Sequence, residues 1–206
     1  MGNFKNIILL PLLTVLVVSF SLTAAAQQVG FGLYTNSDLT LTKLVPEDLD
    51  FGDRISGEGT VQILLADDAV VPIEIEGVAY LDVTVTLTPP DGNFLVLMGD
   101  PDNLTEPEKR MPVNIRMAYY NRGQEGITEI AAKAEAIEVV GNTVTFQIRR
   151  RPGGPPDPPP VPLHAGYTPP VAKAYLFIYG DLTVGNVNAG PYSGQIDVHI
   201  EYSTYQ

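Results

Sequence analysis

The 206-residue chain contains no cysteine and no tryptophan. Without cysteine there is no disulfide, thiol nucleophile, thiolate metal site or lipid-modified N-terminal cysteine, so stability has to come from a hydrophobic core and from sheet hydrogen bonds. The absence of tryptophan removes the side chain best suited to stacking on sugar rings, which weakens a carbohydrate-binding interpretation. The composition therefore favours a protein that does not depend on metal-thiolate or thiol chemistry.

Histidine is also scarce, with only His164 and His199. His199 shares the polar face of an alternating stretch with Asp197 and Glu201. Neighbours on such a face lie roughly 7 Å apart, which frames a metal loosely at best, so a solvent-facing strand surface is the favoured interpretation. No nucleophile elbow, phosphate loop, dinucleotide fingerprint or zinc-protease motif is present. We therefore expect no enzyme, no catalytic residue and no cofactor.

Basic residues are half as common as acidic ones, with 12 Lys and Arg against 24 Asp and Glu and a formal net charge of −12. Such a surface repels nucleic-acid phosphates and anionic membranes. Nucleic acid is therefore not an expected partner. The acidity is interpreted as a solubility property of an exported protein.

One long apolar run is present, at residues 7–20, between Lys5 and the small residues Ala24, Ala25 and Ala26. This order predicts a secretory signal peptide over residues 1–26, cleaved before Gln27. A membrane anchor is the alternative, but the run is shorter than the ~20 residues a spanning helix needs, and a proline interrupts it. We expect a secreted protein of the periplasm, outer surface or extracellular space, with no stable membrane insertion after cleavage.

After Gln27 the sequence consists mostly of short runs rich in Val, Ile, Thr, Tyr and Phe, bounded by turn residues. In residues 80–88, apolar and polar side chains alternate, which is typical of an antiparallel strand with one buried face. Strands are expected at residues 29–35, 39–45, 60–66, 70–76, 80–88, 93–98, 112–120, 143–149, 172–184 and 194–203. The pattern predicts an all-β fold, an Ig-like antiparallel β-sandwich forming a single domain over residues 27–206.

Two stretches depart from the strand pattern. Residues 127–137 place Ile127, Ile130, Ala131, Ala134 and Ile137 at helical spacing, which predicts a short helix that packs on the domain. Residues 152–162 are rich in proline, which excludes a helix and a central strand. A stiff surface loop with polyproline II character is favoured there over a ligand for an SH3-like domain.

An acidic loop at residues 99–108 holds Asp100, Asp102 and Asn103. Alternating oxygen ligands of this kind can bind calcium. The loop lacks the glycine-containing frame of an EF-hand, and the same residues are common in turns. No metal site is predicted, and these three residues are weak candidates only.

Two motifs together carry a family resemblance. The first is LVPEDLDFGDRISGEGTVQI, residues 44–63, and the second is YLFIYGDLTVGNVNAGPYSGQIDVHIEY, residues 175–202. The pair resembles the bacterial secreted β-sandwich family called domain of unknown function 4402, which is similar to spore coat protein U and to pilin-like domains exported by chaperone–usher systems. The resemblance implies a structural or adhesive subunit of the bacterial envelope, without catalytic activity.

The resemblance also implies a mode of assembly. In pilin-like subunits, a strand donated by a neighbour completes an incomplete sandwich. Here the strand-exchange residues would be Ile196, Val198, Ile200 and Tyr202 on the last strand, with Val29, Phe31 and Leu33 as donor. The partners would be copies of the chain or related subunits. For residues 29–35 taken alone, the simpler interpretation as the domain's own first strand is the favoured one. The alternative function is a monomeric extracytoplasmic binding module for calcium or glycans.

Overall fold

The computed structural model describes residues 39–99, 105–122, 127–149 and 170–203. All of them belong to one of two compact units of the chain, residues 33–206. Several expectations concern residues outside this part of the chain and stay predictions. They are the signal peptide, the proline-rich loop, Val29, Phe31, Leu33, Asp100, Asp102, Asn103 and His164.

The larger sheet is built around three long strands of eight, eleven and fourteen residues, each of which has buried side chains in the core. Every strand pair in it is antiparallel. Its strands, in spatial order, are β1 (Thr40–Lys43), β3 (Val71–Val78), β9 (Val171–Val184), β6 (Arg110–Tyr120), β5 (Phe94–Leu97) and β10 (Tyr192–Ser193). Two short strands lie beside this path, with β2 (Gly59–Ile63) on the second half of β9 and β7 (Ile137–Glu138) on the end of β6.

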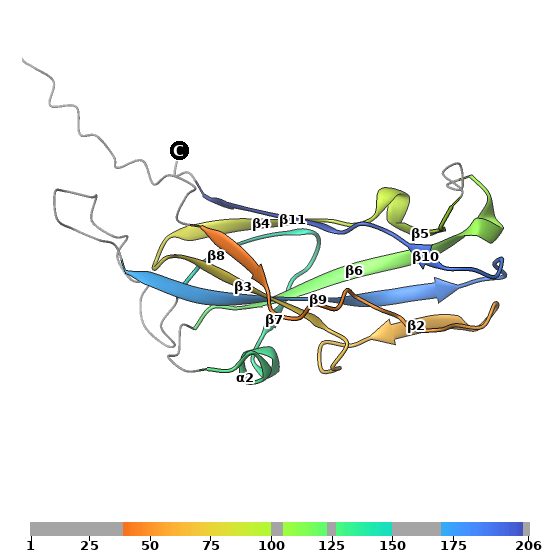
Figure 1. The fold of residues 1–206 in the computed structure, drawn as a ribbon. Helices are drawn as coiled ribbons and strands as arrows, with labels where there is room; N and C mark the ends of the chain where they lie inside the picture. Colours follow the sequence, from red (N-terminus) through yellow and green to blue (C-terminus); the bar gives the residue numbers. More distant parts are fainter. Residues whose placement is uncertain (1–38, 100–104, 123–126, 150–169, 204–206) are drawn as a thin grey trace, which may run out of the picture. The chain divides into compact units, whose positions relative to one another are not determined.

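The smaller sheet has three strands, in the order β11 (Asp197–Tyr202), β4 (Asp82–Thr88) and β8 (Thr143–Gln147). Figure 1 shows it as a second layer over β3, β9 and β6. Two short 3-10 helices, at Asp91–Asn93 and Pro107–Lys109, lie in the connections before β5 and β6. The antiparallel β-sandwich predicted from the sequence is therefore confirmed.

The core lies between the two sheets. In β4, Val83, Val85 and Leu87 are at most 2% exposed, and they belong to one cluster with residues such as Ile75 and Leu176 of the larger sheet. The residues between them on β4 are threonines and an aspartate that are half-buried or exposed. Alternation along β4 thus places one apolar row in the core, which is the main source of stabilisation for this sheet.

The helix predicted within residues 127–137 is confirmed as α2 (Glu129–Ala134). The Thr128 hydroxyl caps it by accepting a hydrogen bond from the Ala131 N–H at 3.3 Å. The predicted packing face is wrong, because Ala132 is buried whereas Ile130 is 71% exposed. The helix is shorter than the apolar pattern, and Ile137 belongs to β7 on the edge of β6. Figure 1 shows α2 beneath the larger sheet, where a helix of this length presents little surface to it.

Candidate functional site

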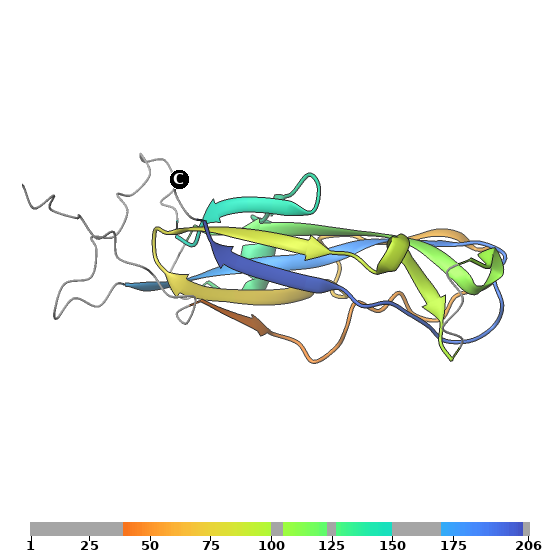
Figure 2. The same cartoon turned by 90° about the horizontal axis from the view of Figure 1, so that it is seen from above.

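On one side of the sandwich, each of the two sheets ends in a strand that has one strand neighbour among the described residues. Within the described ranges, β1 pairs with β3 alone and β11 with β4 alone. Figure 2 shows β1 and β11 along the same side. Between them lies what we call the lateral seam, formed by half-buried apolar side chains that pack against the core. Its residues are Leu41, Leu44, Ile196, Val198 and Ile200.

The strand β11 alternates as the sequence predicts. Val198 and Ile200 are half-buried, whereas His199 is exposed, with Nε2 3.9 Å from the nearer Glu201 carboxylate oxygen. Val198 and Ile200 are less buried than Val85, opposite Ile200 on β4, because β11 is covered from one edge only. Among the residues described, no group of three or more His, Asp or Glu is placed to hold a metal.

One end of the seam is bridged by Tyr202. Its hydroxyl accepts a hydrogen bond from the backbone N–H of Val78, at 2.8 Å, and so links β11 to β3 of the opposite sheet. The ring reaches this point because residue 77 is glycine: a Cβ there would lie 2.7 Å from the Tyr202 hydroxyl and 2.8 Å from Cδ1 of Leu39. Tyr202 and Leu39 thus meet over Gly77. We call this contact the Tyr202 clamp.

Hydroxyl groups hold the same end of β11 within its own sheet. The Ser203 N–H donates to the Asp82 carbonyl at 2.9 Å. The Thr84 hydroxyl lies 2.7 Å from that of Ser203 and 2.9 Å from that of Thr145 on β8. These bonds cross all three strands, so the end of β11 near the Tyr202 clamp is fixed from two directions.

The other end of the seam is crossed by the chain between β1 and β2. The Gly57 N–H donates to the Gly185 carbonyl at 2.7 Å, and the Val187 N–H donates to the Ser56 hydroxyl at 2.9 Å. Residues 185–191 lead from β9 towards β10 and β11. The seam is therefore bounded by Tyr202 at one end and by the Ser56–Val187 contact at the other.

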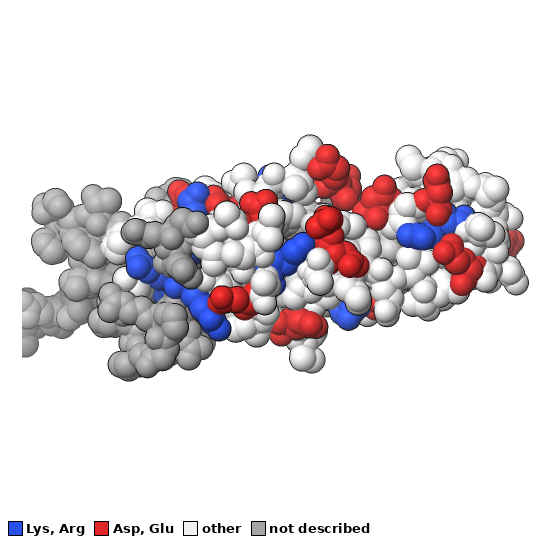
Figure 3. All heavy atoms as spheres, turned by 90° about the horizontal axis from the view of Figure 1, so that it is seen from below, with Lys and Arg blue, Asp and Glu red and all other residues white. Residues whose placement is uncertain are grey.

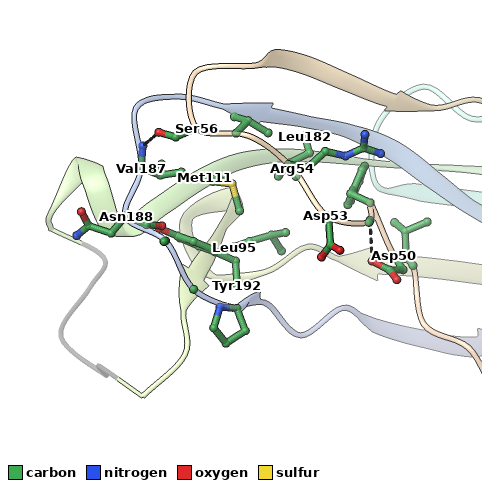
Figure 4. Close-up of a pocket in the computed structure, with 17 residues that line it drawn as sticks. Asp50, Asp53, Arg54, Ser56, Leu95, Met111, Leu182, Val187, Asn188 and Tyr192 are labelled. Atoms are coloured by element: carbon green, nitrogen blue, oxygen red, sulfur yellow. Dashed lines mark hydrogen bonds between the residues drawn. The ribbon is translucent and has the colours of Figure 1, made fainter.

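A cavity of about 750 Å³ opens at the Ser56 end of the seam. It lies between residues 49–56 and 187–192, with apolar side chains including Leu95, Met111 and Leu182 in its wall (Figure 4). Asp50 and Asp53 also line it, and Asp50 is engaged because it accepts a hydrogen bond from the Gly52 N–H at 2.8 Å. The cavity has the size of a small-ligand site and a mixed polar and apolar wall.

Tyr192 forms part of the cavity wall, and its hydroxyl lies 2.9 Å from the Asn188 carbonyl and 3.1 Å from the Glu108 carbonyl. The neutral hydroxyl donates to these carbonyls, and burial raises the pKa of Tyr192 above its ordinary value. Sequence reasoning did not find this cavity. The glycines at 52, 57 and 59 were the signal, since all three have positive φ and mark tight turns around it.

The outer face of the larger sheet carries paired charges. Arg116 Nη2 lies 2.6 Å from Asp181 and the guanidinium lies over the Tyr179 ring, 5.1 Å from its centroid. Lys173 pairs with Glu74 at 2.7 Å. Figure 3, which views this side, shows acidic and basic side chains interspersed. These contacts balance charge locally, and they do not form a patch of one sign for a charged partner.

The fold and the site define an antiparallel β-sandwich in which, among the described residues, β1 and β11 each have one strand neighbour and lie along the same side (Figure 2). In comparisons with known proteins, no family model and no curated protein matches the chain. A solved structure described as "Chaperone-tip adhesin complex is vital for synergistic activation of CFA/I fimbriae biogenesis" aligns with a TM-score of 0.39 and 11% identity. The alignment covers 81% of this chain and 43% of that chain, so the present chain spans less than half of it. A similarity this low supports no argument about function, and the family resemblance stays a prediction.

Proposed function

We propose that the chain is a secreted bacterial cell-surface subunit, structural or adhesive and pilin-like, without catalytic activity. The observation that carries the proposal is the lateral seam. Two strand edges without a second strand neighbour in the described part of the chain lie on one side of the sandwich, over half-buried apolar residues. Such an edge is a template for another strand.

An added strand would gain backbone hydrogen bonds from β11 and would cover Val198 and Ile200, which their own sheet covers from one side only. Main-chain pairing supplies affinity in such complexes, and alternate side chains supply specificity. The partner we propose is a second copy of the chain or a related subunit, with Val29, Phe31 and Leu33 as the donated row. The seam would then be an assembly site at the envelope surface.

The first test uses the chain from Gln27 onward, measured by size-exclusion chromatography with light scattering. We expect concentration-dependent oligomers that disappear when residues 27–35 are deleted. A stable monomer that merely unfolds after this deletion would show that strand donation is wrong.

A second test keeps the chain at full length. Ile200→Asp places a charge in the lateral seam, and His199→Asp, one residue away on the exposed face, is the matched control. We expect Ile200→Asp to abolish the oligomers and His199→Asp to leave them unchanged. Equal loss in both variants would point to a general charge effect instead of pairing at the seam.

The cavity favours one other function, a monomeric binding module. Its volume of about 750 Å³ is in the range of small-ligand sites, and Asp53 and Arg54 lie in its wall. Calorimetry with a panel of soluble glycans, and separately with calcium, tests this function. A glycan module should release heat that Asp53→Ala removes, and no heat with either ligand class excludes this candidate.

A further inference from the structure

The chain that borders the cavity, residues 46–56, is packed in an unusual way. It forms no helix or strand, yet Phe51 at its centre is only 6% exposed and belongs to the core cluster. Leu49 packs against the same cluster. We call residues 46–56 the strap, because they connect β1 to β2 along the edge of the larger sheet. The strap therefore fills part of the core with a side chain that no strand holds in place.

Few backbone bonds hold the strap. The Leu44 N–H donates to the Pro72 carbonyl just before it, and the Gly57 N–H donates to the Gly185 carbonyl just after it. Between these points, the described structure gives the strap no backbone–backbone hydrogen bond to a strand. Lys43 and Asp48 form an exposed ion pair at 2.6 Å, which is a weak restraint. Apolar burial of Phe51 and the Val187–Ser56 bond are the main attachments to the sandwich.

The strap also has defined pivots. Gly52 has φ 72°, directly after Phe51, and Gly57 has φ 83° at the end of the strap. Glycine adopts this conformation without the steric cost other residues meet, and it also reaches the extended region freely. The backbone around Phe51 can thus change conformation without strain. Phe51 lines the cavity, so it can leave the core into space that already exists.

We propose that the strap is a displaceable plug, in which Phe51 occupies the place that an apolar side chain of an incoming strand takes on assembly. This inference rests on the proposed function, because it concerns how the lateral seam is kept closed before pairing. An incoming strand enters at the Ser56 end, since the Tyr202 clamp and the hydroxyl bonds of Ser203 fix the opposite end. The strap holds the Ser56 end of the seam closed until the strand of a neighbour replaces Phe51 there.

An engineered disulfide tests this inference, and the absence of native cysteine means that no other thiol competes. Ser56 and Val187 are in direct contact, with the Ser56 hydroxyl 2.9 Å from the Val187 nitrogen. Ser56→Cys with Val187→Cys locks the strap when oxidised and frees it when reduced. The control pair is Thr86→Cys with Thr143→Cys, which face each other on β4 and β8, away from the seam. Mass spectrometry confirms each disulfide.

The readout is binding of a fluorescent synthetic peptide of residues 27–38 to the chain from Gln27 onward. We expect the oxidised lock to weaken binding by a factor of about ten or more relative to the reduced protein. The control pair should bind equally in both states. Equal binding by the oxidised and reduced lock overturns the plug and leaves the proposed function standing. Failure of the unmodified chain to bind the peptide at all overturns the proposed function instead.

A second variant should change the affinity for the peptide in the opposite direction. Phe51→Leu keeps an apolar side chain in the core but makes fewer contacts, so the plug leaves more easily. We expect tighter peptide binding with a single cooperative unfolding transition retained. Unchanged or weaker binding in a folded Phe51→Leu protein contradicts the plug.

Discussion

The Gly77→Ala substitution is the most specific test of the Tyr202 clamp, which bounds one end of the lateral seam. A methyl group at this position would lie 2.6 Å from Cδ1 of Ile148, 2.7 Å from the Tyr202 hydroxyl and 2.8 Å from Cδ1 of Leu39. Ile148 is fully buried, and the Tyr202 hydroxyl is fixed by its bond to Val78. Gly77→Ala therefore has to displace at least one of three side chains that meet over it.

The cost of this substitution has two parts. Overpacking a core of this kind costs about 1–3 kcal/mol. Displacing Tyr202 leaves the Val78 N–H without its partner, and since Val78 is 1% exposed, this adds about 1–3 kcal/mol. Alanine has less conformational entropy than glycine in the unfolded chain, and this difference offsets the destabilisation by about 0.4–1 kcal/mol. We expect Gly77→Ala to lower the free energy of unfolding by about 1–5 kcal/mol.

Urea unfolding measures this change, and a double-mutant cycle identifies its origin. Tyr202→Phe alone should cost about 1–3 kcal/mol, because the buried Val78 N–H loses the hydroxyl that accepts its hydrogen bond. In the Tyr202→Phe background, Gly77→Ala should cost about 1–2 kcal/mol less than in the wild type, since the hydroxyl it would displace is already absent. Gly185→Ala is the control, as a methyl group there meets no atom within 4 Å. A Gly77→Ala effect as small as that of Gly185→Ala, or strict additivity in the cycle, would refute the Tyr202 clamp.

Two further predictions concern Tyr179 on β9 of the larger sheet and Phe146 on β8 of the smaller sheet. Burial, followed by a hydrogen bond to Glu138, raises the pKa of Tyr179 from 10.0 to about 12. The shift corresponds to about 2–3 kcal/mol of stabilisation, which is present below pH 10 and is lost as the pH rises to 12. In Tyr179→Phe, the free energy of unfolding should therefore change less with pH across that interval. Phe146 is 6% exposed and stacks on Tyr119 at 4.4 Å, so Phe146→Ala should cost about 3–5 kcal/mol in urea unfolding. Val140→Ala, at a residue 99% exposed, should stay within about 0.5 kcal/mol, and a comparable loss in both variants would contradict the assigned core.

The strands were predictable where the sequence alternates. Residues 80–88 and 194–203 show an apolar row with a two-residue period, and both contain strands of the smaller sheet, β4 and β11. The degree of burial was not predictable from this pattern. Val85 is fully buried and Val198 only half-buried, because burial depends on whether a strand lies in the middle or at the edge of its sheet. Alternation shows which side chains share a face of one strand, but it does not show which strands lie beside it.

Contacts between residues far apart in the chain could not be predicted from the sequence. The Tyr202 clamp joins residues 124 positions apart, and nothing in the local pattern near Gly77 distinguishes a glycine that admits a ring from one that forms a turn. The burial of Phe51 in the strap was not predictable either, since Phe51 stands among Asp and Gly residues that indicate a surface loop. The helical spacing of apolar residues gave the wrong packing face for α2, where tertiary context decided that Ala132 and not Ile130 is buried.

The described residues contain no helix long and apolar enough to cross a membrane. The proposed export and surface location rest on the predicted signal peptide, which lies outside this part of the chain. Alkaline phosphatase fused after residue 26 and after residue 60 in a bacterial host tests the export. We expect both fusions to be active and the N-terminal residues to be absent from the exported product. An inactive fusion at residue 60 would contradict secretion.

The most direct test of strand pairing at the lateral seam is amide hydrogen exchange with and without the peptide of residues 27–38. Pairing adds backbone hydrogen bonds along β11 and β1, for which the described part of the chain provides one strand neighbour each, so their amides should exchange more slowly when the peptide is bound. The edge strand β8, on the other side of the smaller sheet, should be unchanged. Slower exchange confined to the loops around the cavity, or equal slowing in β8 and β11, would contradict strand pairing at the seam.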